Sequence, residues 1–217
     1  MTYPINIGIV DDHPVFCNGL ELFIKEKIRS YSVTLVAYSG FELFETLRSR
    51  PNNHPDIILM DIDMKPMNGI EATHRLWLDY PQIKVLPMTS IENESTLRRI
   101  IAVGACGYLT KSDAPEDLQV ALDRVSKFGF YYSKVALKIM GDPFWQEKHR
   151  TTGTIPLSKR ERVFVNLSCS DLTYKEIADR MNVSENTIRD YRMHVFQKLR
   201  VKSRSGMIMH AFMYGLV

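Results

Sequence analysis

The sequence predicts an α/β unit, with a doubly wound five-stranded parallel sheet, linked to an all-α unit of four helices. Residues 1–128 alternate short apolar runs with amphipathic stretches of helical period, whereas residues 157–217 show helical period and no convincing strand. Residues 129–156 lie between them and become rich in Gly, Pro and Thr at 141–156, so we predict a linker that starts with a short helix near 131–140. A chain of 217 residues accommodates two ordinary domains.

The individual elements follow in chain order. Strands are predicted at 5–10, 33–38, 57–60, 84–88 and 106–109, and helices at 14–28, 40–49, 69–79, 92–103 and 114–128. Alternation of this kind produces a parallel sheet covered by helices on both faces. Further helices are predicted at 158–169, 173–181, 185–199 and 203–214. Because doubly wound sheets bind ligands beyond the carboxyl ends of their strands, we expect functional residues directly after each strand.

Composition and charge narrow the function classes. Hydrophobic residues make up 45% and charged residues 24% of the chain, which is typical of globular proteins. No apolar run approaches the roughly 20 residues of a membrane helix, and the N-terminus lacks the pattern of a secretory signal. Three widely spaced cysteines, Cys17, Cys106 and Cys169, fit free thiols in a reducing cytoplasm. We therefore expect a cytoplasmic protein that does not contact membranes.

The two halves of the chain carry opposite charge. Residues 1–128 contain 13 basic and 17 acidic residues, and residues 129–217 contain 15 basic and 8 acidic residues. An acidic first half and a basic second half indicate two tasks, with an anionic partner such as nucleic acid for the second.

Carboxylates end two strands that should be neighbours in the sheet. Asp11 and Asp12 follow the first strand, and Asp61 follows the third. Three close carboxylates repel one another and need a cation, and hard oxygen ligands favour Mg²⁺. Each feature alone is also explained by a turn or a helix cap. Their occurrence together at one sheet edge predicts a magnesium site.

A hydroxyl and an ammonium group are expected at the same edge. Thr89 and Ser90 end the fourth strand, and Lys111 follows the fifth. A carboxylate nucleophile, a divalent cation, a hydroxyl and a lysine meet the needs of phosphoryl transfer onto an aspartate. Taken alone, each hydroxyl is equally well explained as a helix cap, and the lysine as a solvated side chain.

The motifs resemble the receiver domain of response regulators over residues 5–128. They are Ile9-Val10-Asp11-Asp12-His13, Ile58-Leu59-Met60-Asp61-Ile62-Asp63-Met64, Met67-Asn68-Gly69, Met88-Thr89-Ser90 and Gly104-Ala105-Cys106-Gly107-Tyr108-Leu109-Thr110-Lys111. The resemblance implies that Asp61 is the phosphoacceptor and that Asp12, Asp61 and the backbone carbonyl of Asp63 bind Mg²⁺, with Asp11 acting through water.

The same resemblance implies that Thr89 and Lys111 hold the phosphoryl group and that Thr89 and Tyr108 form a switch, with Tyr108 turning inward. The sequence departs from the family where Lys65 replaces a usual proline and Pro66 follows, so we expect a reshaped loop with the site retained. Asp63 adds a negative charge near the phosphate and is expected to alter the lifetime of the phosphoryl group.

The second half contains a helix, a three-residue turn and a basic helix. Thr173 and Glu176 form a capping box for the helix at 173–181, and Ser184 caps the helix at 185–199. This is the layout of a helix-turn-helix, in which the second helix enters the major groove. A plain helical bundle with a solvated basic face is the alternative for this segment alone.

Residues 157–217 resemble the LuxR-type DNA-binding domain. The matching residues include Leu157-Ser158-Lys159-Arg160-Glu161, Lys175-Glu176-Ile177-Ala178, Thr187-Ile188-Arg189, Lys198-Leu199 and Ser203-Arg204. The resemblance implies a recognition helix at 185–199, with Arg189, Asp190 and Met193 facing bases. Phosphate contacts are assigned to Lys175, Thr187, Arg192 and Lys198.

Together the two resemblances imply a DNA-binding response regulator of the NarL/FixJ-like kind. The implied partners are a sensor histidine kinase or phosphotransfer protein, double-stranded DNA and a second copy of the chain after phosphorylation. Two alternatives remain. A phosphorylation-independent receiver is favoured by the Lys65-Pro66 change. An aspartate-dependent phosphohydrolase is suggested by Asp61 and Asp63, although such enzymes carry Thr or Val where this chain has Lys65. We therefore expect a protein that is not an enzyme.

Overall fold

The computed structural model describes residues 4–90, 94–113, 115–133, 157–213 and 216. Within them, six strands form one parallel sheet in the order β2-β1-β3-β4-β5-β6. The strands are β1 (Ile5–Val10), β2 (Tyr31–Ala37), β3 (Ile57–Asp61), β4 (Lys84–Thr89), β5 (Gly107–Thr110) and β6 (Tyr131–Tyr132). The predicted doubly wound sheet is confirmed, with one strand more than expected.

The added strand corrects the predicted linker helix at its first residues. Tyr131 and Tyr132 pair with Gly107 and Tyr108 of β5 instead of starting a helix. This pairing needs glycine at position 107, because a Cβ atom there would overlap the backbone carbonyl oxygen of Tyr131. The rest of the predicted helix and the breaker-rich part of the linker, residues 134–156, lie outside the described residues.

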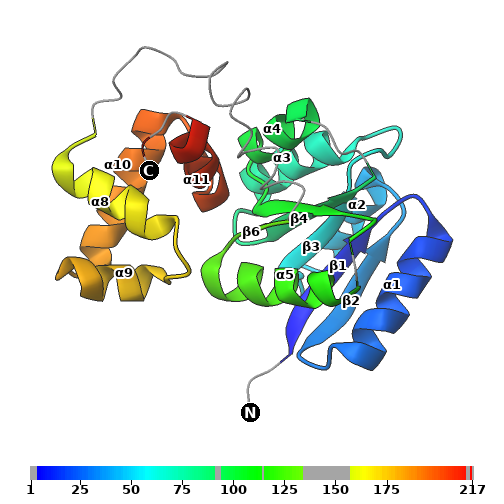
Figure 1. Ribbon diagram of the computed structural model, residues 1–217. Coiled ribbons are helices and arrows are strands. Elements are labelled where there is room, and N and C mark those ends of the chain that lie inside the picture. Colours follow the sequence, from blue (N-terminus) through cyan, green and yellow to red (C-terminus); the bar gives the residue numbers. More distant parts are fainter. Residues whose placement is uncertain (1–3, 91–93, 114, 134–156, 214–215, 217) are drawn as a thin grey trace.

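Helices cover both faces of the sheet (Figure 1). They are α1 (Pro14–Lys27), α2 (Gly40–Ser49), α3 (Gly69–Asp79), α4 (Glu94–Ala102) and α5 (Pro115–Phe128). The buried residues of α1 and α5 pack with one set of strand residues, and those of α2 and α3 pack with the opposite set. The wholly buried β3, IILMD, belongs to both cores, as expected for a central parallel strand.

The C-terminal helices are α8 (Lys159–Ser168), α9 (Tyr174–Met181), α10 (Glu185–Leu199) and α11 (Arg204–Met213). They agree with the predicted ranges to within one residue at each end. The capping boxes of Ser158 with Glu161 and of Thr173 with Glu176 are both formed, and Asn182 ends α9 in the left-handed conformation. Asn182, together with the N-cap Ser184 of α10, sets the short turn between α9 and α10.

The α/β part and the helical part pack against each other through α11, which lies beside α4 in Figure 1. Ile208 and Met209 of α11 share one buried cluster with Ile100, Tyr108 and Tyr132 of the α/β part. Among the described residues, none of the helices is long and apolar enough to span a membrane.

Candidate phosphoacceptor site and nucleic-acid interface

The sheet brings the predicted carboxylates together. Asp61 ends β3, and Asp11 and Asp12 follow β1, which pairs with β3. One ligand atom from each of Asp11, Asp12, His13 and Asp61 lies within 4.8 Å of all the others. Asp11 and Asp61 are buried, whereas Asp12 is exposed at the rim. The expected acidic cluster is therefore present at the carboxyl edge of the sheet.

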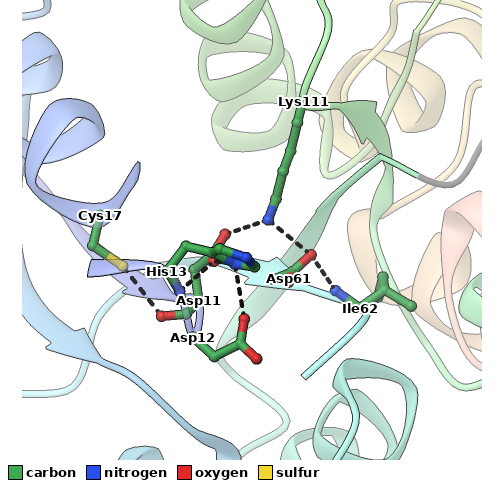
Figure 2. Close-up of polar contacts among 7 residues, drawn as sticks. All are labelled: Asp11, Asp12, His13, Cys17, Asp61, Ile62 and Lys111. Carbon is green, nitrogen blue, oxygen red and sulfur yellow. Dashed lines mark hydrogen bonds and ion pairs between the residues drawn. The ribbon is translucent and has the colours of Figure 1, made fainter. Parts of the chain in front are cut away.

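Lys111 joins this cluster from the end of β5. Its Nζ lies 2.6 Å from Oδ2 of Asp11 and 3.1 Å from Oδ1 of Asp61. Figure 2 shows Lys111 reaching toward both carboxylates. The backbone N–H of Lys111 donates to the carbonyl of Thr89 at 3.0 Å, which fixes the loop after β5 against the end of β4. The lysine thus reaches both carboxylates from a position that the sheet determines.

The charges in the cluster shift two pKa values. Burial and the nearby Asp11 carboxylate raise the pKa of Asp61, although Lys111 and the Ile62 N–H oppose this shift. Burial alone would lower the pKa of Lys111, but its hydrogen bonds and ion pairs with Asp11 and Asp61 outweigh burial and raise it. Lys111 therefore carries its full charge at neutral pH.

The donor set fits a hard divalent cation. The carboxylates of Asp11, Asp12 and Asp61 converge. Mg²⁺ is a hard cation that prefers oxygen ligands such as these. His13 was not predicted as part of the site, yet its Nδ1 lies 3.1 Å from Asp11 and 2.9 Å from Asp12. Its position beside the aspartate pair in the sequence was the available signal. Asp63 is exposed, and its side chain is not among the clustered groups.

The two predicted switch residues lie in different surroundings. Thr89 is fully buried at the end of β4, where it pairs with Thr110 of β5. Tyr108 is also fully buried, in the cluster that α11 completes. Tyr108 is therefore shielded from solvent in the presence of α11, and the inward turn that the resemblance implied stays a prediction.

The loop after Asp61 keeps its closure despite the Lys65-Pro66 departure. The N–H of Gly69 donates to the carbonyl of Ile62 at 3.0 Å, and a Cβ atom at Gly69 would overlap the carbonyl oxygen of Asp61. Glycine is required where backbones approach so closely. Lys65 and Pro66 are exposed and are joined by a cis peptide bond.

The predicted DNA-facing residues lie on two helices of the C-terminal part. Arg189, Asp190, Arg192 and Met193 are exposed on α10, and Lys175 is exposed on α9. Thr187 is half-buried, and its hydroxyl hydrogen-bonds Ser184 at 2.9 Å. The ring of Tyr174, which sequence reasoning missed, supports Arg192 at 5.5 Å from the guanidinium carbon.

Lys198 is engaged within the C-terminal part. Its Nζ donates to both carboxylate oxygens of the buried Glu161 at 2.8 Å. Burial would raise the pKa of Glu161, but hydrogen bonds from Lys198 and Ser158 outweigh it and lower the pKa. The ion pair therefore connects α10 to α8, and the Lys198 ammonium group already has an anionic partner.

The recognition helix faces the α/β part across a cavity of about 730 Å³. Arg189, Arg192 and Met193 line this cavity on one side, and Trp77 and Pro81 line it on the other. The cavity is far too small for a DNA duplex, whose major groove alone is about 12 Å wide. In this arrangement the α/β part obstructs one side of the predicted base-facing surface.

Polar contacts at the start of α11 hold the two parts together. The Arg204 guanidinium donates to the carbonyls of Ser168 and Ser170 in its own part and to the carbonyl of Phe128 across the interface. The hydroxyl of Ser205 donates to the Ala105 carbonyl. An ion pair between Arg124 and Asp171 lies at the edge of the same interface.

Two family models match the chain. The response regulator receiver domain matches residues 7–123, and the LuxR family of bacterial regulatory proteins matches residues 155–211. These ranges contain the acidic cluster and the helix-turn-helix respectively.

Two curated proteins and a solved structure are similar to this chain over nearly its whole length. The chain is 27% identical over 213 residues to the response regulator GacA of Pseudomonas aeruginosa, with 98% of each chain covered. It is 29% identical over 213 residues to the oxygen regulatory protein NreC of Staphylococcus aureus, covering 95% of this chain and 96% of NreC. The RcsB response regulator of Salmonella typhimurium shares the fold, with a TM-score of 0.60 at 20% identity over 95% of this chain and 97% of RcsB.

Proposed function

Because the chain belongs to the response regulators that join a receiver domain to a LuxR-type DNA-binding domain, it is a DNA-binding regulator of transcription, and we propose that it is controlled by phosphorylation of Asp61. The observation that best supports this proposal is that Lys111 lies within ion-pair distance of both Asp11 and Asp61. We assign the receiver to residues 1–128, the linker to 129–156 and the DNA-binding domain to 157–217.

The proposed reaction is transfer of a phosphoryl group from a phosphohistidine to Asp61. A carboxylate oxygen of Asp61 forms the new P–O bond while the P–N bond of the donor breaks, and the donor imidazole keeps the electron pair and takes up a proton. Lys111 offsets the charge on the phosphoryl oxygens, and the Thr89 hydroxyl donates to one of them. Mg²⁺ held by Asp12, Asp61 and the Asp63 carbonyl, with Asp11 through water, would neutralise further charge.

The donor is proposed to be a sensor histidine kinase or a phosphotransfer protein. Its imidazole must approach Asp61 from the exposed side, where Asp12 and His13 form the rim of the site. We propose that the chemistry of this chain is limited to gaining and losing this phosphoryl group and that its output lies in transcription, in keeping with the two families that it matches.

We propose that phosphorylation acts through the cluster that contains Tyr108. Ile100 of α4 and Ile208 of α11 belong to the same cluster, so a movement of Thr89 and α4 toward the phosphoryl group disturbs the contact with α11. Since Tyr108 is already buried, the switch is a shift within this cluster. Release of the DNA-binding domain then exposes α10 and permits homodimer formation.

DNA binding is assigned to the exposed face of the helix-turn-helix. We propose that Arg189, Asp190 and Met193 contact base edges and that Lys175, Thr187 and Arg192 contact phosphates. A duplex reaches Arg189, Arg192 and Met193 only after the receiver moves away from the cavity that they share with Trp77. Two recognition helices of a dimer would then bind paired half-sites.

The test compares wild type with Asp61→Asn in the presence of Mg²⁺ and acetyl phosphate. We expect one acyl phosphate per wild-type chain, no label in the variant, and tighter binding to double-stranded DNA only for the labelled protein. Acid-urea gels combined with mass spectrometry identify the modified residue. A folded wild type that binds DNA equally well without label would instead support the phosphorylation-independent regulator.

A further inference from the structure

A second cavity lies between the two domains; it contains no residue of the acidic cluster and shares Val201 and Lys202 with the cavity beside α10. It encloses about 250 Å³ and is lined by α4 of the receiver, the turn after α10, and α11. Four of its lining side chains are basic: Arg98 comes from the receiver, and Arg200, Lys202 and His210 come from the DNA-binding domain. Among the described lining residues, none carries a carboxylate.

The closed arrangement therefore places cations of both domains around one cavity. Arg98 and Lys202 are half-buried, so their charges are screened less than they would be in open solvent. Lys202 is partly offset by its position 4.2 Å above the Trp77 ring. Burial lowers the pKa of His210 below its ordinary value, so this imidazole contributes a hydrogen-bond donor at neutral pH while the arginines and the lysine supply charge.

We propose that this cavity binds a small organic phosphate monoester. Two guanidinium groups and an ammonium group complement a dianion better than a monocarboxylate, and arginine forks match phosphate oxygens. The remaining wall is apolar, with Ile101 and Met209 available to an organic substituent. The volume lies below the usual 300–1,000 Å³ of drug-sized ligand sites, which favours a short sugar or acid phosphate over a nucleotide.

Such a ligand would couple the two domains. Because both domains contribute cations, the complete site exists only while α4 lies against α11. A ligand that binds only the closed arrangement stabilises it by mass action and opposes release of the DNA-binding domain. The site therefore gives the regulator a second, inhibitory input that is independent of phosphorylation at Asp61.

The test uses calorimetric titration of the full chain with glycerol 3-phosphate, with glycerol as the uncharged control. We expect one site per chain, no binding of glycerol, and affinity weakened about tenfold or more in Arg98→Gln and in His210→Gln. The matched control is Arg99→Gln, which removes the same charge from an exposed neighbour on α4. It should bind like wild type. Thermal unfolding confirms that each variant is folded.

Two outcomes would overturn the proposal. One is no saturable binding at millimolar concentrations, and the other is equal weakening in Arg98→Gln and Arg99→Gln, which indicates a general charge effect. Glycerol 3-phosphate could also still bind to Arg98→Gln and His210→Gln but lose its binding when DNA is added. This result would place the anion on the DNA-contacting surface and overturn the proposal as well. Because this titration requires neither DNA nor labelled Asp61, its failure leaves the proposed phosphorylation untouched, and the reverse also holds.

Discussion

The hydroxyl of Tyr132 in β6 donates a hydrogen bond to the backbone carbonyl of Ser205 in α11 at 2.5 Å. Tyr132 is buried, and this burial raises its pKa well above the ordinary value, so the phenol remains a neutral donor. The bond is remote from Asp61 in sequence, yet it lies in the cluster that holds Tyr108. It therefore connects the proposed switch to the DNA-binding domain.

Removing this hydroxyl should loosen the closed arrangement. Tyr132→Phe keeps the ring but loses a buried hydrogen bond worth about 0.5–1.5 kcal/mol, which shifts the closed–open equilibrium by about twofold to thirteenfold. We expect the unlabelled variant to bind DNA more tightly than wild type by up to that factor. The emission of Trp77, which Lys202 contacts across the interface, reports opening in a Trp145→Phe background.

The adjacent tyrosine provides the control. Tyr131 lies in the same strand, but its side chain belongs to the core that α1 and α5 form on the other face of the sheet. Tyr131→Phe should therefore leave DNA affinity and Trp77 emission unchanged. Equal behaviour of the two variants would show that the Tyr132 bond does not hold the domains together.

The acidic site was predictable because strand ends in a parallel sheet converge. Asp61 and Thr89 end their strands, and Asp11 and Lys111 directly follow theirs, so their chain positions alone place them at one edge. The helix-turn-helix was predictable because its caps are local: Thr173 with Glu176 and Ser184 act within one turn.

The remaining features depend on contacts between distant segments. Tyr131 and Tyr132 form a strand only because β5 offers an open edge with glycine at position 107, and neither condition is visible in a local window. The pairing of Lys198 with Glu161 joins residues 37 positions apart on two helices, so the sequence of α10 alone does not reveal it, and the predicted phosphate contact of Lys198 stays a prediction. The contact of α11 with α4 likewise has no local sequence signal.

The negative charge of Asp63 should shorten the lifetime of the phosphorylated state. Asp63 is exposed two residues after Asp61, and a carboxylate there repels the phosphoryl dianion. We expect Asp63→Asn to lengthen the half-life of phosphorylated protein by about twofold to fivefold at low ionic strength, where screening is weak. Asp79→Asn, on the exposed end of α3, is the control. A half-life equal to that of wild type would rule out this role.

Asp61 should destabilise the fold while it is ionised and no cation is bound. Its pKa is raised in the folded protein, so the folded state disfavours the charged form, and the cost is complete at pH values above the raised pKa. Asp61→Asn should therefore raise the melting temperature at pH 7 in the presence of a chelator. A gain of about 1 kcal/mol corresponds to about 2–4 °C for a chain of this size.

The sign of this effect can be checked by lowering the pH. As the pH falls through the raised pKa, Asp61 binds its proton, and the advantage of the variant should shrink steadily. Asp190→Asn on the exposed face of α10 should show no comparable gain. A variant that melts below wild type at pH 7 would show that the ion pair with Lys111 outweighs burial and the repulsion by Asp11.

Lys198 should contribute to the stability of the DNA-binding domain more than to DNA affinity. Lys198→Met removes two hydrogen bonds from the buried Glu161 carboxylate and leaves it with its cap bonds alone, which should cost about 1–2 kcal/mol. Since hydrogen bonds lower the pKa of Glu161, its stabilising effect is present above the ordinary carboxyl pKa and is lost as the pH falls through the lowered value. The loss on mutation should therefore be largest at neutral pH.

DNA binding separates this structural role from a phosphate contact. A lysine that contacts a phosphate contributes about one unit to the slope of log affinity against log salt concentration. For Lys198→Met we expect an unchanged slope together with a lower melting temperature. The matched variant Lys175→Met, on the exposed side of α9, should show the opposite pattern, with a reduced slope and unchanged melting. A reduced slope in Lys198→Met would mean that the lysine leaves Glu161 when DNA binds.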